Sequence, residues 1–225
     1  VERYLMIPVL GVIPYLEVGE SQGKESFIKT ILFFRRKRKE SESNISRQLL
    51  INYPSQSAIF EAYRILRTNI LIEVLKNQTK GRTILVSSAG PQEGKSINVA
   101  NLGVCLAQAG HKVMIVDLDL RRPAIGKIFG ITSHHRQGLS DVLMQTVKLK
   151  DAVCSIVDLL VEGKEFDKIL ATPGIDNLSF ILAGTQVGNP TELLASQDMS
   201  SVLEKLKEEF DIVLIDSPPI LAVAD

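Results

Sequence analysis

Residues 85–96 of this 225-residue chain read LVSSAGPQEGKS, and few folds accommodate such a segment. An apolar run at residues 84–86 leads into a small, turn-rich loop, which ends in Gly94-Lys95-Ser96 before a helical pattern. Strand, loop and helix in this order are the context that a phosphate-binding loop requires. Ala89 stands where many such loops carry glycine, and an ordinary glycine-rich turn between a strand and a helix is the alternative interpretation.

The residue types of this loop suit an anionic ligand. Because Gly94 has no Cβ, backbone N–H groups can close around oxyanions, and the N-terminal end of the following helix adds positive charge. Lys95 supplies a point charge for the β- and γ-phosphates of a nucleotide, and the Ser96 hydroxyl can ligate Mg²⁺. The loop therefore predicts a nucleotide-phosphate site.

Strand and helix patterns alternate on both sides of the loop. Strand 83–88, helix 96–109 and the fully apolar strand 113–116 form a βαβ unit, which is right-handed almost without exception. Further strands are expected at 178–183 and 212–216, and helices at 57–77, 138–143, 151–160, 161–170, 191–196 and 199–210. These patterns predict an α/β fold of three layers, with a mostly parallel sheet flanked by helices.

Acidic residues follow two of the predicted strands. Asp117 and Asp119 come directly after strand 113–116, and Asp216 ends the last strand. In open α/β sheets ligands bind beyond the carboxyl ends of the strands, so these carboxylates should lie near the phosphates. There they can hold Mg²⁺ or accept a proton from a hydroxyl. Asp117 and Asp119 share one direction only if the strand has already turned, and a polar strand end with a helix-capping Asp is the alternative.

Composition excludes several classes of function. Lys+Arg and Asp+Glu balance at 26 each, so no overall charge favours nucleic acid as a partner. Cys105 and Cys154 lie in apolar surroundings, typical of reduced core residues in a cytosolic domain, and the histidines (His111, His134 and His135) carry no metal-binding pattern. No signal peptide and no run of roughly 18 apolar residues is present. A first residue other than Met and an end just after a new strand lead us to expect a fragment of a longer protein.

The first 50 residues differ from the rest. Residues 8–14 form an apolar run bracketed by prolines, which is either an edge strand or an extended docking segment. Residues 17–50 are mostly polar and contain the basic run Arg35-Arg36-Lys37-Arg38-Lys39. This run is either part of a solvated, flexible linker or a contact with an anionic membrane surface.

Helix 57–77 carries charged residues at regular intervals. Glu61, Arg64 and Arg67 spread along one side of it. A Glu61–Arg64 pair within the helix would contribute only about 0.2–0.5 kcal/mol. The two arginines are alternatively suited to bidentate contacts with carboxylates of another subunit.

Taken together, these motifs resemble a known family. The loop, Asp-x-Asp-x-Arg at 117–121 and Ile-Asp-Ser-Pro-Pro at 215–219 are similar to the three nucleotide-binding motifs of bacterial tyrosine autokinases (BY-kinases). Glu61-x2-Arg64-x2-Arg67 is similar to the family's oligomerisation helix, and residues 189–194 and 8–14 also resemble segments of these proteins. BY-kinases are cytoplasmic domains of capsule and exopolysaccharide copolymerase systems, related in fold to MinD/ParA-type ATPases. The resemblance covers most of residues 51–225.

The resemblance implies a P-loop NTPase fold of the MinD/ParA-like (SIMIBI) type that binds ATP and Mg²⁺. The catalytic residues it implies are Lys95, Asp117, Asp119 and Asp216, with Asp117 as the candidate base toward a tyrosine hydroxyl. The metal ligands would be Ser96, Asp117 and Asp216. The nucleotide would contact Gly90, Pro91, Gln92, Glu93, Gly94, Lys95, Ser96 and Ile97.

The resemblance also implies partners and a location. A homo-oligomeric ring in which subunits phosphorylate one another would form through Glu61, Arg64 and Arg67. The polysaccharide polymerisation and export machinery would be the partner, at the cytoplasmic face of the bacterial plasma membrane. Residues 1–50 would be a juxtamembrane segment and linker, and residues 51–225 a kinase domain that lacks its C-terminal part.

Two rival functions remain. The nearest rival is a MinD/ParA-like assembly or partitioning ATPase, whose signature lysine lies five residues before the phosphate-binding lysine. Gly90 occupies that position here, which favours the kinase. The other rival is a nucleotide-binding scaffold with little catalysis. The tyrosine-rich tail of the kinases is absent, and the tyrosines (Tyr4, Tyr15, Tyr53 and Tyr63) are not clustered.

Overall fold

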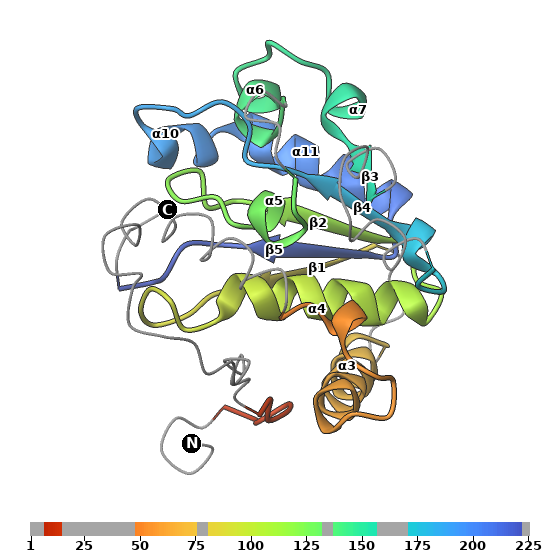
Figure 1. Ribbon diagram of the computed structural model, residues 1–225. Helices are drawn as coiled ribbons and strands as arrows, with labels where there is room; N and C mark the ends of the chain where they lie inside the picture. The colour runs from red at the N-terminus through yellow and green to blue at the C-terminus, as the bar shows by residue number, and fades with distance from the viewer. Residues whose placement is uncertain (1–6, 15–47, 76–80, 132–136, 157–170, 222–225) are drawn as a thin grey trace, which may run out of the picture.

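The computed structural model describes residues 7–14, 48–75, 81–131, 137–156 and 171–221. In this part of the chain a central sheet lies between two layers of helices (Figure 1). The three-layer α/β architecture predicted from the sequence is therefore confirmed. The basic run at 35–39, the helix expected at 161–170 and the residues Tyr4, Tyr15, His134 and His135 lie outside the described residues.

The sheet is mostly parallel. Its strands among the described residues are β1 (Arg82–Val86), β2 (Val113–Asp117), β3 (Cys154–Ser155), β4 (Leu178–Ile181) and β5 (Ile212–Asp216), in the order β1-β5-β2-β4-β3. Every residue of β2 and β5 is buried, as apolar runs in the middle of a parallel sheet require. On the edge strand β1, half-buried and exposed residues alternate.

One predicted helix is wrong in part. Helix α7 (Leu149–Ala152) ends before the middle of the helix expected at 151–160, and strand β3 follows it. Cys154 and Ser155 pair antiparallel with Phe180 and Ser179 of β4. A two-residue strand has no periodicity of its own, so only its partner strand reveals it.

The first helical layer covers one face of the sheet with α4 (Lys95–Gln108). Helix α3 (Ala58–Leu75) lies against α4 on the side away from the sheet (Figure 1). A Cβ on Gly103 would lie 2.6 Å from Ile115 Cδ1, so glycine lets α4 approach β2 closely. The short elements η1 (Leu50–Asn52), α5 (Ile125–Ile128) and η2 (Ile175–Asn177) complete this layer.

The second layer covers the opposite face. It contains α6 (Leu139–Leu143), α7, α10 (Pro190–Leu194) and α11 (Gln197–Glu209). Met199, Val202 and Leu206 of α11 are buried, and this helical spacing points one face of α11 at the sheet. The predicted helices in both layers agree with the structure to within two residues at most ends, a normal difference for helix boundaries.

Residues 8–14 form no strand and dock on α3. Asn69 Nδ2 donates a hydrogen bond of 2.7 Å to the Leu10 carbonyl, and a Cβ on Gly11 would lie 3.2 Å from Leu66 Cβ. Ile13 packs against the cluster around Phe60. Of the two interpretations of this segment, the docking segment is therefore right and the edge strand wrong.

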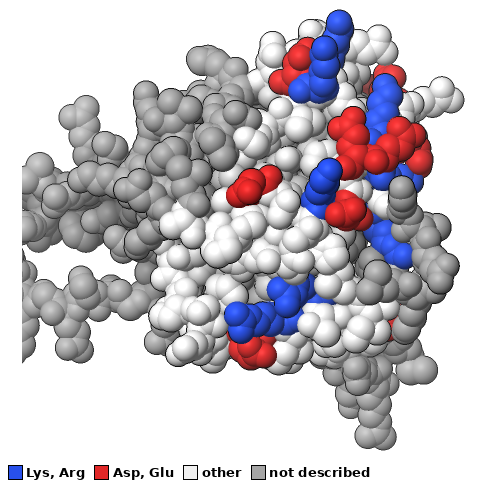
Figure 2. All heavy atoms as spheres, turned by 90° about the vertical axis from the view of Figure 1, so that its right-hand side faces the viewer, with Lys and Arg blue, Asp and Glu red and all other residues white. Residues whose placement is uncertain are grey.

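The two cysteines differ in burial. Cys105 is buried as predicted, Cys154 is half-buried, and neither forms a disulfide in the described part of the chain. On the face drawn in Figure 2, the described Lys and Arg side chains lie among Asp and Glu side chains. None of the described helices has the length and apolar content that crossing a membrane demands.

Candidate nucleotide-binding site

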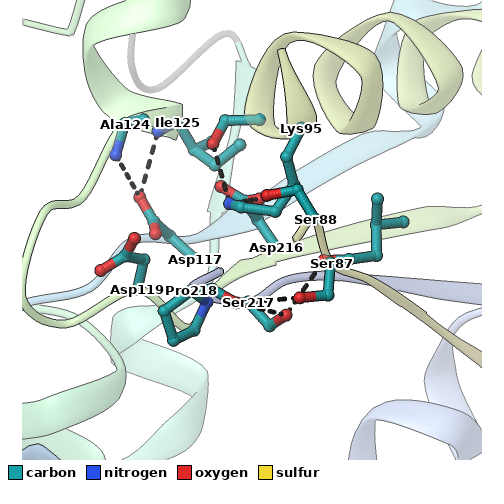
Figure 3. Close-up of polar contacts among 12 residues, drawn as sticks. Ser87, Ser88, Lys95, Asp117, Asp119, Ala124, Ile125, Asp216, Ser217 and Pro218 are labelled. Carbon is teal, nitrogen blue, oxygen red and sulfur yellow. Dashed lines mark hydrogen bonds and ion pairs between the residues drawn. The ribbon is translucent and has the colours of Figure 1, made fainter. Parts of the chain in front are cut away.

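The carboxyl ends of three neighbouring strands bring the predicted site together. Val86 of β1 is in register with Asp216 of β5, and Asp216 is in register with Asp117 of β2. The loops that follow β1 and β5 are joined by hydrogen bonds: Ser87 Oγ donates to the Pro218 carbonyl (2.9 Å) and Ser217 Oγ to the Val86 carbonyl (3.1 Å; Figure 3). The start of the phosphate loop, Asp216 and Asp117 therefore lie next to one another, at the carboxyl ends of three adjacent strands.

The phosphate loop has two residues in the left-handed region. Gly94, the residue before α4, has φ +81°, which glycine adopts without strain. Gln92 has φ +63°, an uncommon conformation for a residue with a Cβ. Strain of this kind persists where the surrounding structure enforces it, and it is found disproportionately at ligand sites. No local sequence pattern predicts the left-handed conformation of Gln92.

The side chain of Lys95 contacts that of Asp216 at the base of the phosphate loop. Its Nζ forms an ion pair with Asp216 Oδ1 and donates a hydrogen bond of 3.1 Å to Ser96 Oγ. The side chain of Asp216 is fully buried and that of Lys95 is 8% exposed. Burial raises the pKa of Asp216, and hydrogen bonds from Lys95 and Ser96 partly oppose that rise. The predicted residues Lys95, Ser96 and Asp216 are therefore in contact.

Asp117 is held by backbone amides. Its Oδ2 accepts hydrogen bonds of 3.1 Å from the N–H groups of Ala124 and Ile125, at the start of α5. Burial, followed by the nearby charge of Asp216, raises the pKa of Asp117 to about 7. An acid with this pKa can hold or release a proton near neutral pH.

Asp119 points to the same side as Asp117 because the chain turns between them. The N–H of Leu120 donates to the Leu118 carbonyl at 2.9 Å, and Figure 3 shows the two carboxylates side by side. Asp119 Oδ1 accepts a hydrogen bond of 2.9 Å from the Arg122 N–H. The question that alternation along the strand left open is thus answered: both carboxylates lie on the same side of the chain, close enough that, besides burial, the charges of Asp216 and Asp119 raise the pKa of Asp117.

A pocket of about 600 Å³ lies between the phosphate loop and the segment that follows β2. Its lining includes the predicted residues Pro91, Gln92, Glu93, Gly94, Lys95, Ser96, Ile97 and Asp119, whereas Gly90, Asp117 and Asp216 do not line it. Sequence reasoning missed Gln48, Arg122 and Lys127, which also line the pocket. The Arg121-Arg122 pair directly after the acidic motif was an available signal for Arg122, but Gln48 had none.

The donor set fits Mg²⁺. Asp117 Oδ1 and Asp216 Oδ2 are buried and have no hydrogen-bond partner in the described structure, and buried polar atoms of this kind are rare without a ligand or water. Mg²⁺ prefers oxygen ligands and is usually bound by one or two carboxylates together with substrate phosphates. The described residues contain no cluster of three or more His, Cys, Asp or Glu that could hold a metal ion, so any ion here would depend on the nucleotide for further ligands.

The charged residues of α3 lie in different surroundings. Arg64 is exposed, 3.6 Å from Glu61 Oε2, and its guanidinium lies 5.0 Å from the centre of the Phe60 ring. Arg67 is half-buried, and its Nη1 donates a hydrogen bond of 3.2 Å to the Cys105 carbonyl of α4. The structure therefore leaves Glu61 and Arg64 at the surface and turns Arg67 toward its own chain.

The first strand of the sheet leads through a glycine-containing loop into α4, and acids end the two strands that follow it in the sheet, β5 and β2. This arrangement defines a P-loop nucleotide-binding protein. A family model described as an AAA domain matches residues 81–225. The chain is 33% identical over 188 residues to tyrosine-protein kinase YwqD of Bacillus subtilis, covering 84% of this chain and 70% of that protein. It is 32% identical over 186 residues to the putative tyrosine-protein kinase CapB of Staphylococcus aureus, covering 83% and 72%.

The fold agrees with these relatives. The solved structure of the BceF tyrosine kinase domain superposes with a TM-score of 0.70 at 31% identity, over 98% of this chain and 75% of that one. The chain therefore belongs to the family of bacterial tyrosine-protein kinases, and the family resemblance inferred from its motifs is confirmed.

Proposed function

We propose that this chain transfers the γ-phosphoryl group of ATP to tyrosine hydroxyls, including those of its own copies, with Mg²⁺ as cofactor. The observation that carries this proposal is that the phosphate loop, Asp216 and Asp117 follow or end three adjacent strands at the same level of the sheet. Each of the two acids has one carboxylate oxygen without a hydrogen-bond partner in the described structure. Phosphoryl transfer needs mainly positioning and neutralisation of charge, which this arrangement provides.

Lys95 is proposed to bind the β- and γ-phosphates. Its ammonium now contacts Asp216 at the base of the loop, and phosphate oxygens entering the pocket would compete for that charge. Ser96 and the unpaired oxygen of Asp216 are the groups proposed to hold Mg²⁺ directly, and Asp117 is proposed to hold it through a water molecule. When bound, the ion neutralises negative charge on the phosphates. Backbone N–H groups at the start of α4 add positive partial charge at the same place.

Asp117 is the proposed base for the tyrosine hydroxyl. A base works best when its pKa lies near the working pH, and the pKa of Asp117 is raised to about 7. Its Oδ2 is occupied by the N–H groups of Ala124 and Ile125, which leaves Oδ1 to accept the proton. Asp119, which lines the pocket, is proposed to orient the incoming hydroxyl.

The direct test is a kinase assay on a substrate in trans. The chain is incubated with ATP, Mg²⁺ and a glutamate–tyrosine copolymer, and phosphotyrosine and free phosphate are both measured. We expect phosphotyrosine on the copolymer, lost when EDTA removes Mg²⁺. Free phosphate without phosphotyrosine would instead support the MinD/ParA-like ATPase, and nucleotide binding without either product would support the scaffold.

The wider role proposed for the chain rests on its resemblance to BY-kinases. Residues 51–225 would act as a kinase domain and residues 1–50 as a juxtamembrane linker, with the run Arg35–Lys39 against an anionic membrane surface. Copies would assemble through α3 at the cytoplasmic face of the membrane. There the kinase would regulate the polymerisation and export of a capsular or extracellular polysaccharide.

The surroundings of α3 sharpen the assembly part of this proposal. Arg64 is exposed, whereas Arg67 donates a hydrogen bond to the Cys105 carbonyl within the chain. Replacing each arginine should therefore affect a different property, the oligomeric mass for Arg64 and the stability for Arg67. Arg64→Ala should lower the oligomeric mass and leave the melting temperature nearly unchanged. Arg67→Ala should lower the free energy of unfolding by about 1.5–3 kcal/mol, through loss of one hydrogen bond from a charged donor.

Light scattering after size-exclusion chromatography, together with thermal unfolding, measures both effects. Lys205→Ala on α11 is the matched control, because it removes an exposed cation from the opposite helical layer. An unchanged mass in Arg64→Ala would show that α3 is an ordinary surface helix.

A further inference from the structure

A buried tyrosine connects α3 to the phosphate loop. The side chain of Tyr63 is almost fully enclosed, with 1% of the residue exposed. Its hydroxyl donates a short hydrogen bond of 2.6 Å to Asn98 Oδ1 on the first turn of α4, and Asn98 Nδ2 donates one of 2.9 Å to the Gly94 carbonyl. Two hydrogen bonds therefore lead from the middle of α3 to the left-handed residue on which the phosphate loop turns.

A second branch leads from Tyr63 to another wall of the pocket. Asn101, which is fully buried, donates through Nδ2 to the Tyr63 hydroxyl (3.2 Å) and to the Gln48 carbonyl (3.0 Å). Its Oδ1 accepts a hydrogen bond of 2.8 Å from the Leu50 N–H. Gln48 lines the nucleotide pocket. Tyr63 thus lies where the paths to the phosphate loop and to Gln48 meet.

The hydroxyl of Tyr63, and not its ring, makes the hydrogen bonds that lead to the pocket. Leu50, Ile59, Phe60 and Cys105 pack around Tyr63 in an apolar cluster, which a phenylalanine ring would fill equally well. Burial, opposed by the hydrogen bond with Asn101, raises the pKa of Tyr63 to about 12, so the hydroxyl keeps its proton at any physiological pH. Buried polar networks fix one arrangement of the groups they connect when every member is satisfied.

We propose that Tyr63 is a positioning residue that couples α3 to the nucleotide site. Its hydroxyl orients the Asn98 amide, and Asn98 in turn holds the Gly94 carbonyl and the phosphate loop in the conformation that accepts the nucleotide. Contacts made by a partner on α3 then alter nucleotide affinity, and nucleotide binding alters α3 by the same coupling free energy. This proposal rests on the proposed nucleotide binding at the loop.

Tyr63→Phe tests the coupling because it removes one oxygen atom and keeps the packing. We expect the Kd of ADP with Mg²⁺, measured by titration calorimetry, to rise about three- to tenfold, the worth of one hydrogen bond. Tyr53→Phe is the matched control: it removes the same atom from a half-buried tyrosine packed against the same cluster, and its Kd should equal that of the wild type.

Hydrogen exchange supplies a readout that a purely structural tyrosine would not change. In the wild type, ADP with Mg²⁺ should slow amide exchange in α3 as well as in the phosphate loop. In Tyr63→Phe the protection of the loop at saturating nucleotide should remain, whereas the protection of α3 should be lost. A variant that melts earlier but keeps the wild-type Kd and the nucleotide-dependent protection of α3 would overturn the proposal.

The single variant Asn98→Ala, which should also raise the Kd, tests the coupling if Tyr63→Phe does not fold. A double-mutant cycle covers the case in which Tyr63→Phe changes the Kd for another reason. If Tyr63 acts through Asn98, adding Tyr63→Phe to Asn98→Ala should raise the Kd no further, whereas independent residues would give additive effects. Additive effects, or an Asn98→Ala protein with the wild-type Kd, would also overturn the coupling. A wild type that binds no nucleotide would contradict the proposed function itself.

Discussion

Lys95→Met should abolish phosphotyrosine formation and also destabilise the nucleotide-free protein. Loss of the ammonium removes the charge proposed to bind the β- and γ-phosphates, and removal of one stabilising charge at such a site lowers the rate by about 10²–10³-fold or more. The same change leaves the fully buried Asp216 without its cation. Breaking a buried ion pair from one side costs roughly 3–5 kcal/mol.

The two effects of Lys95→Met can be separated. Lys95→Met combined with Asp216→Asn removes both charges, so we expect stability to recover while activity stays absent. Chemical denaturation with EDTA present measures the first, and the copolymer assay measures the second. A single variant that keeps its phosphotyrosine signal would remove Lys95 from the proposed mechanism, and a double variant as unstable as the single one would contradict the ion-pair explanation.

Asp117→Asn should stabilise the nucleotide-free protein at about pH 8 and have no such effect at about pH 4. The pKa of Asp117 is about 7 in the folded protein and 3.8 as an ordinary Asp. Between these values the unfolded chain has lost the proton and the folded chain has kept it. The free energy of unfolding therefore falls as pH rises through this range, by about 1.4 kcal/mol for each unit of pKa difference.

Asparagine keeps the shape of Asp117 and cannot ionise, so its amide oxygen can still accept the N–H groups of Ala124 and Ile125. We expect a stability gain of roughly 2–4 kcal/mol at about pH 8 that shrinks steadily toward about pH 4. Denaturation curves of both proteins in EDTA across this range measure it. A gain independent of pH would show that packing, and not ionisation, is responsible, and retention of full kinase activity would exclude Asp117 as the base.

Much of this site was predictable because its signals are local. The loop around Lys95 and the acids that end two apolar strands are each contained in a few consecutive residues, and parallel pairing then brings the strand ends together. The order of the strands places β5 between β1 and β2, which makes Asp216 the neighbour of both Lys95 and Asp117. The residues that meet at the centre could therefore be predicted from local patterns.

What the sequence could not supply depends on contacts between distant segments. Gln48 lines the pocket, and its carbonyl accepts a hydrogen bond from the amide of Asn101, which is far away in the chain. Arg67 has the spacing of a surface residue on α3, yet the neighbouring α4 offers it the Cys105 carbonyl. Strand β3 exists only through its pairing with β4. In each case the determining partner is far away in the chain, and no local pattern records it.

The alignment of Val86, Asp216 and Asp117 has a consequence for how this sequence can diverge. Side chains alternate between the two faces of a strand, so inserting or deleting a single residue within β2 or β5 would rotate the terminal acid to the opposite side of the sheet. Loops at the far end of the sheet can change length without moving either carboxylate. Length variation among functional descendants of this sequence should therefore be confined to the loops, with the two strands keeping a constant number of residues.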